Sequence, residues 1–184
     1  SYNTPLGLAL TILRQLDDRH DIFLAELGEY QVKDIENFLN WIRPLYAILT
    51  PIGHAHGERF QSADQLVSTF LPLLTSKYAP ATLWVDDRNR HFIPDTAKVQ
   101  WYGYETDSDL QLTIKEVKLD GPSGKISLNG NNTFDVHTRL LGKHQLLNAL
   151  PAIGITKMLD GNIDTAVTSL AYPPDIPRRL SLSH

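Results

Sequence analysis

The most informative part of this chain is the stretch from residue 47 to residue 62, AILTPIGHAHGERFQS. An apolar, strand-like run ends there in a turn that carries His54 and His56. A second short apolar run, residues 21–28, ends in a carboxylate, Glu26. In parallel α/β sheets the carboxyl ends of the strands open onto the ligand crevice. A carboxylate and an imidazole brought there by separate strands predict a site that holds a divalent cation or performs acid–base chemistry.

The first half of the chain alternates between helix and strand patterns. Apolar residues at helical spacing predict helices over residues 6–16, 32–42 and 63–74. Short apolar runs predict strands over residues 22–25, 45–49 and 81–85, the first of them buried. This order predicts an α/β fold with a mostly parallel sheet, in which right-handed crossovers join the strands and helices flank them.

The pattern changes after residue 95, and an antiparallel β segment is expected at about residues 98–138. Its β-rich runs are residues 99–104, 110–119, 125–128 and 133–138. Clustered Gly and Asn at residues 121–124 and 129–132 are typical of the turns between such strands. Helical periodicity then returns over residues 145–159 and 164–171, and Pro173-Pro174 ends the second helix.

Composition limits the class of protein. A chain of 184 residues is long enough for one domain with a hydrophobic core. Its formal net charge of −4 argues against a nucleic-acid interface, which needs a basic face. No apolar run approaches the roughly 20 residues that span a bilayer, and no secretory signal is visible. The chain has no cysteine, which excludes disulfides and thiolate metal sites, so we expect a cytoplasmic protein.

Four patches of the sequence resemble the central domain of the Mur ligases, the ATP-dependent amide-forming enzymes of peptidoglycan precursor synthesis. The branch it resembles most adds D-alanyl-D-alanine to the UDP-muramoyl tripeptide. The patches are SYNTPLG at residues 1–7, FLAELG at residues 23–28 with Asp34-Ile35, TPIGHAH at residues 50–56 with Phe60 and Ser62, and LGKHQLLNAL at residues 141–150 with PRRL at residues 177–180. They occur in the family's order across nearly all of the chain.

The resemblance implies a role for several residues. Glu26 would be a magnesium ligand, directly or through water, and His56 would be a ligand of a second magnesium near an acyl phosphate. Asn148 would hydrogen-bond the adenine region, and Arg179 would reach the nucleotide from the far side of the cleft. Asn3 and Thr4 would lie near the substrate side of the cleft.

The resemblance also implies the reaction and its partners. The family activates a carboxylate of a nucleotide-sugar peptide with ATP, and an amino-acid or dipeptide amine attacks the resulting acyl phosphate. Catalysis of this kind is mainly positioning and charge neutralisation. The implied architecture is a P-loop-NTPase-like domain over residues 1–180, followed at residues 181–184 by the start of a linker to a C-terminal domain.

One departure from the family is a missing phosphate-binding loop. The chain contains no G-x-x-G-K-[ST] sequence, whose backbone amides and Lys would hold the nucleotide phosphates. In the family this loop lies immediately upstream of the segment that residues 1–7 resemble, so either truncation or natural shortening explains its absence. We therefore expect residues 1–184 alone to be folded but inactive.

A second departure lies inside the chain. Where the family has a Lys, carbamoylated in many members, and a Glu two residues later, this sequence has Phe70 and Pro72. Phenylalanine cannot bridge two metal ions, and proline removes a helical hydrogen-bond donor. Lys77 is seven residues further on, about 10 Å along a helix, which is too far to substitute. Gln145 replaces an Asn of the family pattern, amide for amide.

Three functions therefore stay open: part of a Mur-type ligase, a degenerate Mur-like domain that binds a ligand or partner without catalysis, and a metal hydrolase that uses Glu26, His54 and His56. Each proposed site residue also has a structural interpretation. Glu26 could be a surface charge, His56 a loop residue, Asn148 a capping side chain and Arg179 a solvated cation. The run Asp86-Asp87-Arg88-Asn89 is interpreted as a turn whose acidic side chains bind backbone. The aromatic side chains at residues 101, 102 and 104 are interpreted as packing.

Overall fold

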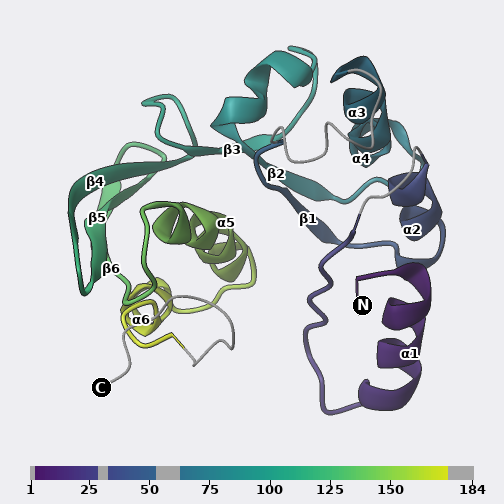
Figure 1. Ribbon diagram of the computed structural model, residues 1–184, viewed down its shortest axis with the longest axis horizontal. Coiled ribbons are helices and arrows are strands. Elements are labelled where there is room, and N and C mark those ends of the chain that lie inside the picture. The colour runs from purple at the N-terminus through teal and green to yellow at the C-terminus, as the bar shows by residue number, and fades with distance from the viewer. Residues whose placement is uncertain (1–2, 29–32, 53–62, 174–184) are drawn as a thin grey trace. The chain divides into compact units, whose positions relative to one another are not determined.

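The computed structural model describes residues 3–28, 33–52 and 63–173 (Figure 1). The chain divides into two compact units. Unit 1 consists of Ser1–Leu45 and Gly53–Ala81, and unit 2 consists of Tyr46–Ile52 and Thr82–His184. The predicted domain boundary at residue 180 lies outside the described residues and stays a prediction.

Unit 1 is helical. Its helices are α1 (Pro5–Gln15), α2 (Asp34–Ile42), α3 (Ala63–Phe70) and α4 (Pro72–Thr75). Helix α1 begins where the sequence predicts, because the Thr4 hydroxyl accepts a hydrogen bond from the Gly7 N–H at 3.2 Å and Pro5 suits the first helical position. Helix α2 buries Ile35, Phe38 and Leu39, which share one face at helical spacing, as predicted.

The single helix predicted over residues 63–74 is divided in two. Helix α3 ends at Phe70, and α4 begins at Pro72. Proline has no N–H to donate to the preceding turn, and its ring clashes with the carbonyl four residues before it. Pro72 instead occupies the first position of a new helical turn, which the Ser76 N–H closes by donating to the Pro72 carbonyl at 3.0 Å.

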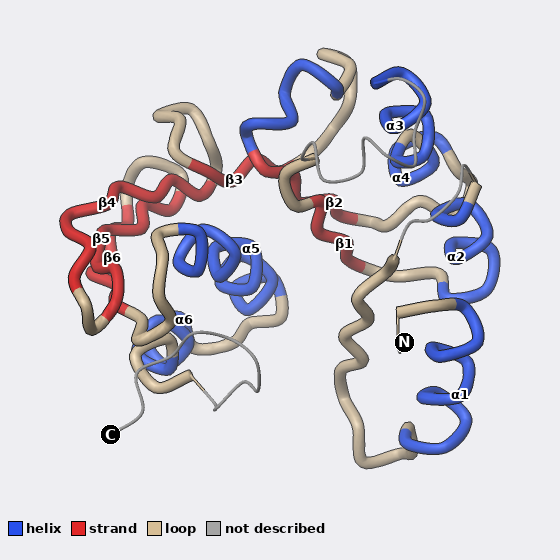
Figure 2. Tube along the Cα trace, in the orientation of Figure 1, coloured by secondary structure: helices blue, strands red, loops and turns tan. Residues whose placement is uncertain are grey.

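The buried strand predicted over residues 22–25 is wrong. Residues 21–28 form no strand and are drawn as loop in Figure 2, and Ile22 and Leu24 are 68% and 85% exposed. A strand needs a hydrogen-bonded neighbour. In the described part of the chain, the backbone of this segment pairs with other backbone only where the Gly28 N–H donates to the Asn3 carbonyl at 3.1 Å. Glu26 therefore does not lie at the end of a strand.

Unit 2 contains a six-stranded sheet in the order β1-β2-β3-β4-β5-β6 (Figure 2). The strands are β1 (Tyr46–Leu49), β2 (Thr82–Asp86), β3 (Gln100–Gly103), β4 (Leu110–Lys118), β5 (Gly121–Leu128) and β6 (Asn132–His137). Strands β1 to β4 pair in parallel, and β4, β5 and β6 pair antiparallel. A 3₁₀ helix, η2 (Asp87–Phe92), follows β2.

This topology corrects two expectations about the second half of the chain. The antiparallel segment begins at β4, because β3 is parallel to both of its neighbours. Residues 121–124 are not a turn but the first half of β5, whose Gly121 pairs with Lys118. The predicted turn at residues 129–132 is present, and Asn129 and Gly130 adopt the positive φ angles, 48° and 73°, that such a turn requires.

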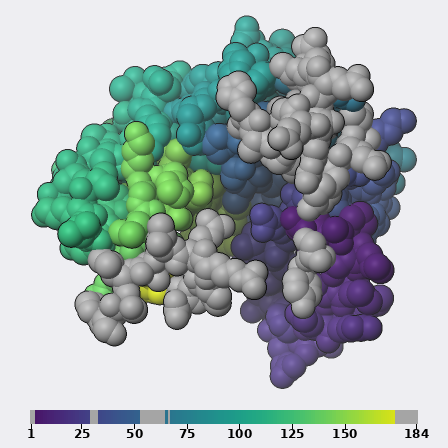
Figure 3. Space-filling view, in the orientation of Figure 1, coloured from purple at the N-terminus to yellow at the C-terminus, as the bar shows by residue number. Residues whose placement is uncertain are grey.

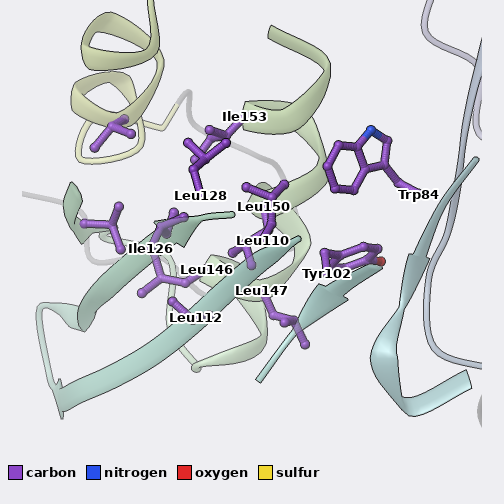
Figure 4. Close-up of a cluster of buried hydrophobic side chains, with 12 residues drawn as sticks. Trp84, Tyr102, Leu110, Leu112, Ile126, Leu128, Leu146, Leu147, Leu150 and Ile153 are labelled. Carbon is purple, nitrogen blue, oxygen red and sulfur yellow. The ribbon is translucent and has the colours of Figure 1, made fainter. Parts of the chain in front are cut away.

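The core of unit 2 is the contact between the sheet and helix α5 (His144–Met158), with α6 (Ile163–Ser169) packed on α5 and β6. Figure 1 shows α5 inside the curve of strands β3 to β6, and Figure 3 shows atoms of this light-green segment reaching the surface beside the strands. Figure 4 shows Leu146, Leu147, Leu150 and Ile153 of α5 directed at the side chains of the sheet. None of the described helices is both long enough and apolar enough to cross a bilayer.

Gly154 sets how closely α5 approaches the sheet. A Cβ atom at this position would overlap Cζ2 of the Trp84 ring and lie 2.9 Å from Leu110 Cδ1. Trp84 is buried, so its ring has little space into which to move. Its indole N–H has no hydrogen-bond partner among the described residues, so packing is what fixes the ring there.

Gly154→Ala is therefore expected to lower the free energy of unfolding, because overpacking a core usually costs about 1–3 kcal/mol. This loss should outweigh the roughly 1 kcal/mol by which alanine is the better helix former. Urea denaturation of the purified chain measures the change. In a Trp84→Phe background the same substitution should cost less, because the smaller ring leaves room for the methyl group. A Gly154→Ala variant at least as stable as the wild type would contradict this packing.

Candidate functional site

Three of the predicted site residues lie in the described part of unit 1. Asn3 precedes α1, and its carbonyl accepts the hydrogen bond from Gly28 that ties the segment carrying Glu26 to the start of the helix. Thr4 caps α1 through its hydroxyl, so its side chain has a structural role. The Glu26 residue is exposed. The structure therefore places the backbone of Gly28, two residues after Glu26, against Asn3, and the roles of Asn3, Thr4 and Glu26 stay predictions.

The other predicted residues lie elsewhere. Asn148 belongs to unit 2, where it is exposed on α5. His54, His56 and Arg179 lie outside the described residues. The predicted meeting of Glu26 and His56 in one cleft therefore stays a prediction.

The chemistry of Glu26 fits one ligand position of a magnesium ion. Magnesium takes one or two protein carboxylates, keeps several waters and completes its shell with phosphate oxygens. An exposed carboxylate meets that requirement. Among the residues that the structure describes, no three His, Asp or Glu side chains gather closely enough to form a complete metal site.

The best-defined polar cluster is at the carboxyl edge of the parallel strands of unit 2. Asp86, the last residue of β2, is fully buried. Its carboxylate accepts the Arg88 N–H at 3.1 Å and pairs with the Arg88 guanidinium through Nε at 2.7 Å and Nη2 at 2.9 Å. The bidentate contact with Asp86 raises the pKa of Arg88. This geometry confirms that the Asp-Asp run is a turn whose carboxylates bind backbone.

Asp87 organises the loop between β3 and β4. Its Oδ2 accepts hydrogen bonds from the Glu105 N–H at 2.8 Å and the Ser108 hydroxyl at 3.3 Å. The carboxylate lies against the backbone of Gly103, where any Cβ atom would overlap it. Glycine is therefore required at the end of β3 because a buried carboxylate occupies the space of a side chain.

Two tyrosines complete the cluster. Tyr102 is fully buried, and its hydroxyl is 3.4 Å from the Leu49 carbonyl at the end of β1. Burial raises the pKa of Tyr102 strongly, and the negative charge of Asp86 raises it further. Burial also raises the pKa of Tyr104, although the nearby Arg88 opposes that shift. The predicted packing role of Tyr102 is confirmed, because it belongs to the hydrophobic core.

Asn89 is a residue whose role the sequence did not predict. It is 1% exposed, donates through Nδ2 to the Thr50 carbonyl at 2.9 Å and accepts through Oδ1 from the Ile52 N–H at 2.9 Å. It therefore holds the chain where it leaves β1. Its place in the run Asp86-Asp87-Arg88-Asn89 marked it only as part of a turn.

The two residues that the resemblance places where the family has Lys and Glu lie at the junction of α3 and α4. Phe70 is the half-buried last residue of α3, and Pro72 starts α4. The distance of Lys77 from position 70 stays a prediction, and its Nζ lies 4.8 Å from the centroid of the neighbouring Tyr78 ring. In the described part of this region, no lysine is positioned on α3 to take the place of the missing one.

Comparison with known proteins identifies the relatives of the chain. Residues 1–156 match the Mur ligase middle domain. A UDP-N-acetylmuramate–L-alanine ligase from Desulfitobacterium hafniense is 28% identical over 162 residues, which cover 86% of this chain and 35% of the relative. The chain thus spans about a third of the length of the curated relatives that it matches.

Solved structures with similar folds include the MurF ligase from Thermotoga maritima in complex with ADP, which has a TM-score of 0.76 and 21% identity and covers 97% of this chain and 42% of its own. The UDP-N-acetylmuramoylalanyl-D-glutamyl-2,6-diaminopimelate–D-alanyl-D-alanyl ligase from Acinetobacter baumannii has a TM-score of 0.77 and 17% identity and covers 96% and 39%. These likenesses confirm the predicted α/β fold. The predicted branch is only partly confirmed, because the structural relatives include D-alanyl-D-alanine-adding enzymes whereas the curated sequence relatives are L-alanine ligases.

Tyr102→Phe is expected to change the pH dependence of stability above pH 10. An unfolded tyrosine has a pKa near 10.0, and the folded Tyr102 has a raised pKa. Unfolding therefore releases a proton above pH 10, so the stability that Tyr102 contributes is complete below that pH and declines by about 1.4 kcal/mol per pH unit as the pH rises. Urea midpoints between about pH 8 and pH 11 should decline less steeply for the variant. Tyr172→Phe, in which an exposed ring is changed, should keep the wild-type slope. Equal slopes for Tyr102→Phe and wild type would contradict the assignment.

Proposed function

Because the chain belongs to the Mur ligase middle domain family, we propose that it is the central domain of an ATP-dependent ligase of peptidoglycan precursor synthesis, acting in the cytoplasm. The match over residues 1–156 carries this proposal. The ADP complex of the Thermotoga maritima relative supports a nucleotide as one ligand. The names of the relatives support a nucleotide-sugar acceptor and either an amino acid or a dipeptide as the incoming amine.

In the proposed reaction, an acceptor carboxylate oxygen attacks the γ-phosphorus of ATP, and ADP leaves. The amine nitrogen then attacks the acyl carbon of the resulting acyl phosphate. The amide bond forms, inorganic phosphate leaves, and solvent takes up the proton that the amine loses. We assign Glu26 and His56 to hold magnesium, which supplies neutralisation of the phosphoryl charge when bound. The exposure of Glu26 supports its part in this assignment.

The remaining assignments concern binding. Asn148 is proposed to contact the adenine region, and its exposed position on α5 supports this role. Arg179 is proposed to reach the nucleotide. Asn3 and Thr4 are proposed on the substrate side, where the backbone contact between Asn3 and Gly28 keeps them near the Glu26 segment.

A second function, binding without catalysis, is favoured by two observations. The helix that should carry a Lys and a Glu two residues later ends at Phe70 and restarts at Pro72. The 184-residue sequence also has no G-x-x-G-K-[ST] loop to hold phosphates. If both features hold in the whole protein, the domain would bind a nucleotide-sugar peptide or a protein partner and not turn it over.

The whole protein in which residues 1–184 occur, with any flanking sequence, should release ADP when given ATP, magnesium and a matched acceptor and amine. A coupled ADP-release assay compares two pairs: UDP-N-acetylmuramate with L-alanine, and the UDP-muramoyl tripeptide with D-alanyl-D-alanine. Residues 1–184 alone should give no ADP above the blank, because no phosphate-binding loop is present.

The same assay separates the two functions. If the whole protein binds the acceptor but releases no ADP with either pair, the ligase proposal fails and the non-catalytic function stands. If a Phe70→Lys variant then released ADP, the result would show that the wild type is inactive because it lacks the lysine and not because its fold has changed. ADP release by residues 1–184 alone would refute the predicted inactivity of the chain.

A further inference from the structure

Asn89 joins two parts of unit 2 that are far apart in the sequence. Its carboxamide bonds the backbone at Thr50 and Ile52, which are 39 and 37 residues away. The last residue of β1 to pair with β2 is Leu49, opposite Val85. The side chain of Asn89 therefore continues the hydrogen bonding of β1 beyond the end of the strand, with one donor and one acceptor in place of a backbone partner.

The support beneath Asn89 is itself fixed. Asn89 belongs to η2, and the Asp86 carboxylate caps the start of that helix through the Arg88 N–H. The Tyr102 hydroxyl faces the Leu49 carbonyl at the same edge. Because the side chains of Asp86, Asn89 and Tyr102 are buried, breaking these contacts would leave the polar group of each side chain without its partner.

We propose that Asn89 is a positioning residue that fixes the direction in which the chain leaves β1. This inference rests on the proposed function, because two residues beyond Ile52 the sequence reaches His54 and then His56, the proposed metal ligand. Asn89 acts only through the described segment Thr50–Ile52 and touches no reacting atom.

The first test needs only residues 1–184 and no catalysis. In Asn89→Ala, hydrogen exchange of the Ile52 amide should accelerate at least about tenfold relative to amides of the β4–β5 pair, because its acceptor is gone. Asn162→Ala is the matched control, since Asn162 bonds the Thr165 N–H at 2.8 Å at the start of α6, away from β1. The control should leave exchange at Ile52 unchanged. Unchanged exchange at Ile52 in Asn89→Ala would overturn the positioning role.

The second test uses the whole protein in the ADP-release assay. Asn89→Ala should shift the magnesium concentration for half-maximal rate upward and leave the KM of the amine unchanged, a combination that general destabilisation would not produce. Faster exchange at Ile52 with an unchanged magnesium dependence would overturn the link to the site and make Asn89 purely structural. If the wild type releases no ADP, the proposed function fails, and the exchange result still decides whether Asn89 fixes the chain.

Discussion

The packing of α5 against the sheet is the interaction on which unit 2 depends. Strands β3 and β4 pair at only two positions, Tyr102 with Leu110 and Gly103 with Gln111, so the backbone joins the parallel and antiparallel halves of the sheet weakly. Tyr102 and Leu110 are both fully buried in the core beneath α5. Burial of such side chains stabilises by about 1.5–3 kcal/mol each. Side-chain packing therefore holds together a junction that has few hydrogen bonds.

This packing leaves the carboxyl edge of the parallel strands free to be polar. Within four residues, Asp86, Asp87 and Asn89 hold the start of η2, the loop after β3 and the exit of β1, respectively. Each of these buried side chains satisfies its own polar atoms by bonding backbone groups. The segments that leave this edge are consequently held by a rigid scaffold, which is what a binding site at the carboxyl ends of parallel strands requires.

Much of the fold was predictable from local patterns. Helices α1, α2, α5 and α6 and strands β1, β2 and β4 follow from apolar spacing, caps and turn residues that act within a few residues of each other. The features that were predicted wrongly or missed depend on contacts between residues far apart in the sequence. Residues 22–25 have the composition of a strand but no partner in the described chain, and β3 looked antiparallel because composition does not reveal strand direction. The contacts of Asn89 span nearly 40 residues, so no local pattern could have indicated them.

Of the predicted site, Glu26, Asn148, Asn3 and Thr4 can be placed, whereas His56 and Arg179 lie outside the described residues.

The break at residue 71 bears more directly on catalysis than the polar edge does. Position 70 is the last residue of α3, and position 72, where the resemblance places a glutamate, holds a proline, which has no carboxylate. Neither Phe70 nor Pro72 carries a charge that could neutralise a phosphoryl group. The carboxyl edge, in contrast, serves both functions equally, because a ligand that is bound and a ligand that reacts both need the exit of β1 held in place. The geometry of unit 2 thus supports a binding site, and the chemistry that replaces the missing lysine decides whether that site also catalyses.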